Sequence, residues 1–361
     1  MKFLAVLIAL AAGSALAQGT DAPAPAGAST TAPALADLDP DAYFKGKMGG
    51  TFGKNIVEVL PAGKRVAVAG FRVAFVTNNS VTANVRASYL PGRDSSGARS
   101  SLHVALQGVD PAAMQAVTDK AYATLLTELQ KAGREVVPLA DMKDFVAGVD
   151  ATPTSESKPY GKEQHGQTVA FFSPTGLPLW FSHLDAGWGD RGAFDLNNHR
   201  RMGEYSAKWN AIVISPLIVV NFARMSSSGN TSGLTSRTAQ TGAELSMSVA
   251  GLSSYYGRAE EFRSGVIMKG DEGGFNLAAP VVSPLAFGTL KQASAEDNTA
   301  VKGVFDSLGK LAGMGNAGGA ATSSSRNLAE TSNAAYSAAA LDALDRTSRT
   351  LARWFQKYPA P

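Results

Sequence analysis

The sequence predicts an α/β or α+β fold, in which a long helix covers a layer of strands and is followed by a β-rich second half and a C-terminal helix. Three observations support this prediction. Apolar residues alternate with polar ones in several segments, as in strands, and recur every three or four positions in two others, as in helices. The 37 glycines and 17 prolines also indicate many turns.

The N-terminus has the order of a secretory signal. Lys2 precedes an apolar run over residues 3–12, and Ala15 and Ala17 are small residues two positions apart. The run is too short for a bilayer span, which needs about 20 residues. We therefore expect residues 1–17 to be removed on export. The product is expected in the periplasm, either soluble or associated with the outer membrane from the periplasmic side.

Residues 18–42 are rich in Ala, Pro, Thr and Ser without apolar periodicity, which indicates a disordered tether. An α/β layer is expected over residues 43–148. It opens with a near-continuous apolar run at 66–76, typical of a strand buried on both faces. Alternating strands are expected at 81–89 and 102–106, and a turn at Asn78-Asn79-Ser80.

The clearest predicted element is a helix after the third strand. Asp110 is a good N-cap, Pro111 suits the first helical position, and Gly133 supplies the stop. One apolar face repeats at steps of three and four: Met114, Val117, Ala121, Leu125 and Leu129. A strand over 134–139 follows directly, so the helix is expected to cover one face of the sheet.

The second half is expected to be β-rich over residues 149–308. The apolar run at 212–225 is too short to span a membrane, and with the alternating residues 245–249 it predicts a long hairpin whose mobile tip is the Ser/Thr/Gly-rich segment 226–242. Ser-Pro steps are expected at strand ends or bulges; they are Ser173-Pro174, Ser215-Pro216 and Ser283-Pro284. A flexible linker over 309–330 and a C-terminal helix over 331–361 complete the prediction.

Residues 64–140 carry a resemblance to a known family. The order of a KRVAVAGF strand, further strands, a long helix and the segment LQKAGREVVPL resembles the periplasmic α/β domain of the curli-secretion-channel family. The 212–256 stretch resembles it more loosely. The resemblance implies a role in envelope assembly. The chain has no cysteine, so it departs from that family in lacking the lipidated cysteine.

The richest group of chemically active side chains falls between residues 180 and 199. Its histidines and carboxylates could ligate a divalent metal or support hydrolysis, and its tryptophans could stack on a sugar ring. The candidate residues are His183, Asp185, Asp190, Asp195, His199, Trp180 and Trp188. Their spacing matches no established zinc motif, and the Gly-rich segment is equally typical of a structured polar loop.

These observations leave two hypotheses open. The favoured one is a non-enzymatic periplasmic envelope-assembly or binding protein that forms a homo-oligomer or binds another envelope protein, with peripheral membrane contact. The alternative is a periplasmic metal-assisted hydrolase that uses the 183–199 cluster. A net charge of +3 gives no basic footprint for nucleic acid. The Gly-rich residues 313–319 lack the Gly-Lys-Ser/Thr ending of a phosphate loop, and no cofactor is expected.

The signal prediction has a direct test. N-terminal sequencing of the exported protein should begin at Gln18, because signal peptidase cuts after the second small residue of an A-x-A site. An intact Met1, or a product retained in the cytoplasm, would contradict it.

Overall fold

A thirteen-stranded mixed sheet and the helices packed against it make up the described part of the chain. The computed structural model describes residues 38–48, 56–85, 88–90, 93–95, 98–154, 159–164, 166–183, 185, 188–189, 196–232, 236–263, 266–293 and 321–359. All of these belong to one compact unit, residues 35–361. None of the described helices combines the length and the hydrophobicity needed to cross a bilayer.

The strands and helices have the following bounds. The strands are β1 Phe44–Met48, β2 Arg65–Val68, β3 Arg72–Val85, β4 Ser88–Leu90, β5 Arg93–Ser95, β6 Ala98–Gln107, β7 Glu135–Val136, β8 Tyr160–Gln164, β9 Gln167–Phe172, β10 Ile212–Ser232, β11 Ser236–Arg263, β12 Val266–Leu277, β13 Val281–Val282, β14 Gly288–Gln292 and β15 Ala321–Thr331. The helices are α1 Pro40–Tyr43, α2 Ile56–Val59, α3 Pro111–Lys131, α4 Lys143–Gly148, α5 Asn197–Trp209 and α8 Asn333–Gln356, with 3-10 turns at Leu60–Ala62 and Leu139–Met142.

The main path through the sheet runs β1-β12-β11-β10-β3-β6-β15-β14. Strand β10 is its centre, since it pairs antiparallel with β11 and parallel with both β2 and β3. Strand β6 pairs antiparallel with β3 and parallel with β15. Mixed pairing of this kind places residues from both halves of the sequence in one sheet.

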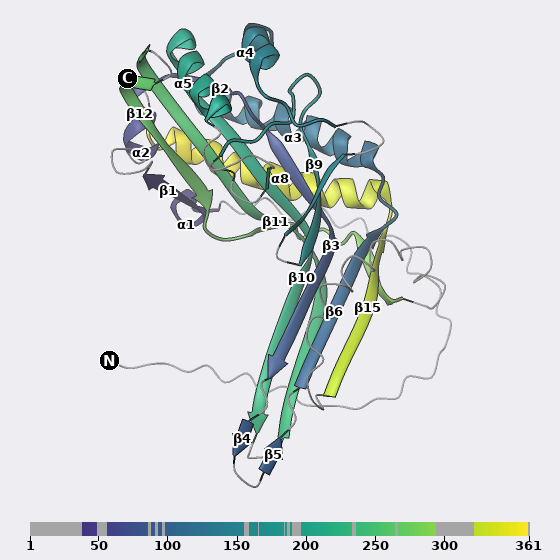
Figure 1. Cartoon of the computed structure of the whole chain (residues 1–361). Helices are drawn as coiled ribbons and strands as arrows, with labels where there is room; N and C mark the ends of the chain where they lie inside the picture. The colour runs from purple at the N-terminus through teal and green to yellow at the C-terminus, as the bar shows by residue number, and fades with distance from the viewer. Residues whose placement is uncertain are drawn as a thin grey trace. The chain divides into compact units, whose positions relative to one another are not determined.

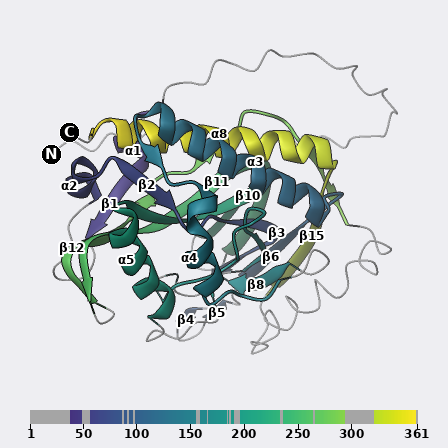
Figure 2. The ribbon, with the colours of Figure 1, turned by 90° about the horizontal axis from the view of Figure 1, so that it is seen from above.

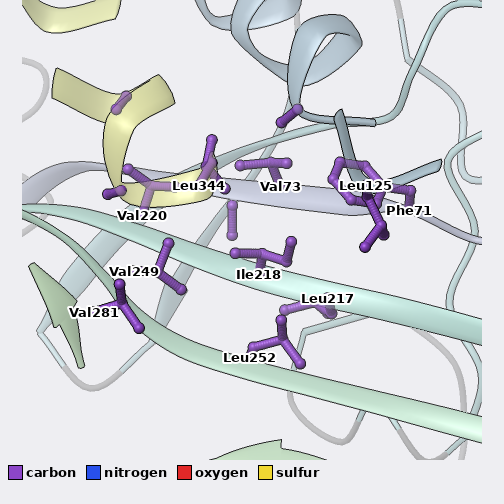
Figure 3. Packing of buried hydrophobic residues seen from close by; sticks show 14 of the residues in the cluster. Phe71, Val73, Leu125, Leu217, Ile218, Val220, Val249, Leu252, Val281 and Leu344 are labelled. Atoms are coloured by element: carbon purple, nitrogen blue, oxygen red, sulfur yellow. The ribbon is translucent and has the colours of Figure 1, made fainter. Parts of the chain in front are cut away.

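The principal core joins this sheet to α3 and α8. Leu125 from α3 and Leu344 from α8 lie with strand residues such as Val73 and Ile218 in one buried cluster (Figure 3). The two helices run side by side (Figures 1 and 2). A second cluster joins α4 and α5 to β2 and β10 through residues such as Phe145 and Val213. Burial of apolar surface of this kind is the dominant favourable term in folding.

Helix α3 has the ends that its sequence predicts. The Asp110 side chain accepts a hydrogen bond from the Ala113 amide at 2.8 Å, which satisfies one of the free N–H groups of the first turn. Gly133 has a φ of +81°, in the left-handed region where a side chain would be strained. The prediction of this helix is therefore confirmed, and its predicted apolar residues are all buried.

The β10–β11 hairpin and the β3–β6 pair lie face to face in the lower part of Figure 1. The β10–β11 pairing continues through the Ser/Thr/Gly-rich segment as far as Ser232 and Ser236. The Asn79 amide of β3 donates to the Asn221 side chain of β10 at 2.7 Å, and the hydroxyls of Ser100 on β6 and Thr241 on β11 are 3.0 Å apart. These contacts place β10 over β3 and β11 over β6 (Figure 1). We call this four-strand stack the arm.

The inner face of the arm explains why the hairpins stack. Met247 and Val249 on β11 and Leu102 and Val104 on β6 are all buried. Small or polar residues replace them towards the end of the hairpins, where Ser100 meets Thr241. The alternating residues of β11 are thus covered within the chain itself.

Two predicted strand breaks are misplaced. Asn78-Asn79-Ser80 is not a turn, because β3 runs through it and pairs with β6 and β9 there. The break falls earlier, between β2 and β3, so the apolar run at 66–76 is two strands. Ser215-Pro216 lies within β10 and not at its end. Pro216 is tolerated because β2 pairs with β10 up to Ile214 and β3 begins to pair only at Leu217.

Two predicted boundaries also need correction. Residues 321–330 belong to strand β15, whereas the Ser-rich composition predicted a linker through residue 330. Backbone partners on β6 supply the pairing that this composition does not signal. The predicted tether ends earlier than residue 42, because α1 begins at Pro40. The other predicted tether and linker residues, 18–37 and 309–320, lie outside the described residues, as does the signal segment.

The α3 face gives a stability prediction. Leu125 is buried in the core and Gln130 is exposed on the same helix. Leu125→Ala should lower the free energy of unfolding by about 2–5 kcal/mol, because it removes buried methyl groups and leaves a cavity. Gln130→Ala should change it by no more than about 0.5 kcal/mol. Equal effects in urea melts would show that the face is misassigned.

Candidate functional site

Arg72 is buried beneath the segment that carries the candidate residues. Its guanidinium ion-pairs with Asp185 and donates to the carbonyl of Trp180 at 3.2 Å. It also donates to the carbonyl and the hydroxyl of Ser215 at 2.6 and 2.8 Å, and its Nε is 3.5 Å from the carbonyl of Pro216. All five N–H donors of the side chain are therefore engaged. The burial of a charged group at this position depends on these partners.

Asp185 and Trp180 have structural roles. Asp185 accepts from Arg72 and from the backbone amide of Ser182, at 2.8 Å. Trp180 is fully buried, with its indole N–H 3.3 Å from the carbonyl of Ala69 and Arg72 over its ring. Gly70 allows this packing, because a Cβ there would come within 2.8 Å of the Trp180 ring. Neither side chain is exposed enough to bind a metal ion or to stack on a sugar ring.

The two candidate histidines do meet. The rings of His183 and His199 lie edge to face, with centroids 5.2 Å apart. His199 is in the first turn of α5, and its Nε2 is 3.2 Å from a carboxylate oxygen of Glu272 on β12. The hydroxyl of Tyr255 on β11 is 3.4 Å from the same nitrogen. Residues far apart in the sequence thus form one partly buried polar group, which we call the histidine cluster.

Trp188, a further candidate, has contacts of its own. Trp188 is partly buried and packs edge to face on Phe171, and its carbonyl accepts from the Tyr160 hydroxyl at 3.3 Å. Asp190 and Asp195 lie outside the described residues. Of the seven predicted site residues, the structure therefore brings together His183 and His199.

The histidine cluster includes the carboxylate of Glu272, and its surroundings change the pKa of that group. The hydrogen bond from His199 lowers the pKa of Glu272 below its usual range; burial opposes this, and Tyr255 reinforces it. The Nδ1 atom of His199 is buried and has no hydrogen-bond partner in the described part of the chain. Across those same residues, no group of three His, Asp or Glu side chains is arranged to hold a metal ion. The geometry thus joins His199, Glu272 and Tyr255 through one ring nitrogen of the histidine.

The chain matches no family model, and comparisons with curated proteins and with solved structures also find no match.

Sequence reasoning did not find three residues that organise this region. Arg72 lies in an apolar strand, where an isolated basic residue signals a buried partner. Tyr255 and Glu272 lie on β11 and β12, and their distance in sequence from His199 gives no local signal. The helix α5 that carries His199 was also not predicted.

Arg72 gives a second stability prediction. Arg72→Met should lower the free energy of unfolding by about 3–5 kcal/mol, because it leaves Asp185 partly buried without its counter-charge. Lys64→Met is the control, since the Lys64–Glu135 pair is more than half exposed on both sides. Exposed pairs contribute about 0–1 kcal/mol. A loss of similar size in both variants, measured by urea unfolding, would contradict the anchoring role of Arg72.

The lowered pKa of Glu272 gives a pH prediction. A carboxyl whose pKa is lower in the folded state stabilises the protein above its unfolded pKa, about 4.3, and that stabilisation is lost as the pH falls through the folded value. The part of the stability difference between the wild type and Glu272→Gln that comes from this carboxyl should therefore be constant above about pH 5. It should shrink as the pH falls below about 4.3. Urea melts across this range measure it.

A double variant identifies the partner. In a His199→Gln background, the pH-dependent part of the Glu272→Gln effect should be smaller, because His199 is the main cause of the lowered pKa. An unchanged pH dependence in that background would show that another group is responsible.

Proposed function

We propose that the chain is a non-catalytic envelope-assembly or binding protein of the periplasm that works through association with further copies of itself. The sequence supports the location through its signal-like N-terminus. The resemblance of residues 64–140 to the curli-secretion-channel domain is consistent with the proposal. The observation that carries it is the presence of two strand edges that no described strand pairs, one on β11 of the arm and one on β15 beside it.

The first edge belongs to β11. Its residues 236–247 pair with β10 alone among the described strands, because β13 and β12 begin to pair only at 248 and 253. The second edge belongs to β15, where β14 pairs with residues 327–331 and β6 with the other side. Residues 321–325 therefore present backbone N–H and C=O groups to which no described strand is bonded on that side.

These edges have little of the usual protection. Natural edge strands avoid association through charged side chains, prolines or bulges. Residues 321–325 contain no charged residue or proline, and residues 236–247 contain Arg237 and Glu244 but no lysine or proline. The register between β10 and β11 is regular from residue 236 to residue 245. Each edge can accept a strand by backbone hydrogen bonding. Because the two edges differ, pairing the β15 edge of one copy with the β11 edge of the next gives a head-to-tail contact.

The remaining features fit a binding role better than catalysis. The arm is rich in serine and threonine. Asp185 and Trp180 of the candidate site are committed to internal contacts. The histidine cluster then serves to fix α5 to β11 and β12.

The edge proposal predicts a change in association. Ser323→Lys with Ser325→Lys places two charges on exposed positions of β15 and should weaken self-association by about tenfold or more, because a paired edge would bring these lysines against another chain. Ala123→Lys with Thr127→Lys adds the same charge to exposed positions of α3 and should leave association unchanged. Sedimentation velocity over a concentration series measures both.

Two results would contradict the proposal. One is a wild-type protein that stays monomeric at every accessible concentration. The other is an equal loss of association in the β15 and α3 variants, which would show that added charge alone is responsible.

A further inference from the structure

Three carboxylates lie along the contact between α3 and α8. They are Glu128 of α3 and Asp342 and Asp345 of α8, and the charges of Glu128 and Asp342 both act on Asp345. The two helices run side by side here (Figure 2). A cavity of about 270 Å³, lined by Glu128, Arg346 and Arg349 among others, lies beside the three carboxylates. The helices are therefore not fully packed against each other at this level.

Two of the three carboxylates have a cation at close range. Glu128 pairs with Lys131 at 2.7 Å, and Asp342 pairs with the Nε of Arg346 at 2.8 Å. Asp345 is half-buried, and its Oδ1 is buried and accepts no hydrogen bond within the described part of the chain. A buried acceptor without a donor is costly, and the cost is larger when the group is charged.

These surroundings favour the protonated form of Asp345. Burial raises the pKa of its carboxyl, and the negative charges of Asp342 and Glu128 add to the rise. The hydroxyl of Thr124 on α3 and the guanidinium of Arg349 act in the opposite direction, and the net shift is upward. The carboxyl therefore holds its proton to a higher pH in the folded protein than in the unfolded chain.

We propose that Asp345 is a pH-sensitive switch in the contact between α3 and α8. With its proton, the side chain is neutral and lies at the contact at little cost. Without it, a negative charge with a buried, unpartnered oxygen lies near the carboxylate of Glu128, and the two helices separate more readily. Helix α8 follows β15 with only Ser332 between them, so the element that responds is directly joined to a strand of the sheet. The inference does not rest on the proposed self-association.

Acid should favour the closed helix pair. A carboxyl whose pKa is higher in the folded state stabilises the protein below its unfolded pKa, about 3.9 for aspartate, and that stabilisation is lost as the pH rises through the folded value. Asp345→Asn keeps the size of the side chain and removes the charge at every pH. The protection of α8 against hydrogen exchange in this variant, relative to the wild type, should rise by about fivefold or more between about pH 4 and pH 7, the expected effect of removing an unpaired buried acceptor charge.

Mass spectrometry of α8 peptides measures this exchange, with peptides of α5 as the internal reference. Asp144→Asn is the matched control, since it makes the same chemical change at an exposed position of α4. It should leave the relative protection of α8 independent of pH. Carboxyl carbon NMR of the wild type gives a second measurement, in which the signal that Asp345→Asn removes should titrate with a midpoint above about 3.9.

Three results would overturn the proposal. The first is a relative protection of α8 that stays constant across this pH range. The second is an equal rise in the Asp144→Asn control or in the α5 peptides, which would show that the response is not confined to the helix pair. The third is an Asp345 signal that titrates at or below about pH 3.9.

Discussion

The buried guanidinium of Arg72 is the constraint on which the rest of the structure depends. It sits at the first residue of β3, opposite Leu217 in the pairing with β10. Through Ser215 and Pro216 it fixes β10, and through Trp180 and Asp185 it fixes the segment that leads to the histidines. A buried charge is tolerated only with such partners, so the loop, β3 and β10 are bound to one position.

The arm follows from this junction. Strands β3 and β10 pair in parallel over only four residues, from Arg72 to Phe75, and then β3 turns to pair with β6. The two hairpins are left free to stack, and their apolar inner faces make the stack favourable. Each hairpin covers the inner face of the other. The backbone N–H and C=O groups to which no described strand is bonded are therefore at the strand edges. The proposed head-to-tail association therefore depends on the same junction.

Local sequence patterns predicted four features, because each depends on neighbouring residues. These features are the cap at Asp110, the apolar repeat of α3, the long hairpin and the C-terminal helix. Predictions failed where partners are distant in sequence. Asn79 looks like a turn residue but pairs with Asn221, and Ser323–Ser325 look like a linker but pair with β6. In the candidate site, the convergence of His183 with His199 was within reach of sequence reasoning, whereas Tyr255 and Glu272 were not.

Disulfide trapping tests the stacking of the two hairpins most directly. The chain has no cysteine, so Ser100→Cys with Thr241→Cys introduces the one possible pair. The hydroxyl oxygens of these residues are 3.0 Å apart, and a disulfide forms only when the two Cβ atoms are about 3.5–4.5 Å apart. The structure predicts a disulfide within a single chain, seen by mass spectrometry of the oxidised monomer. A disulfide that links two chains, or two thiols that stay reduced under oxidising conditions, would contradict it.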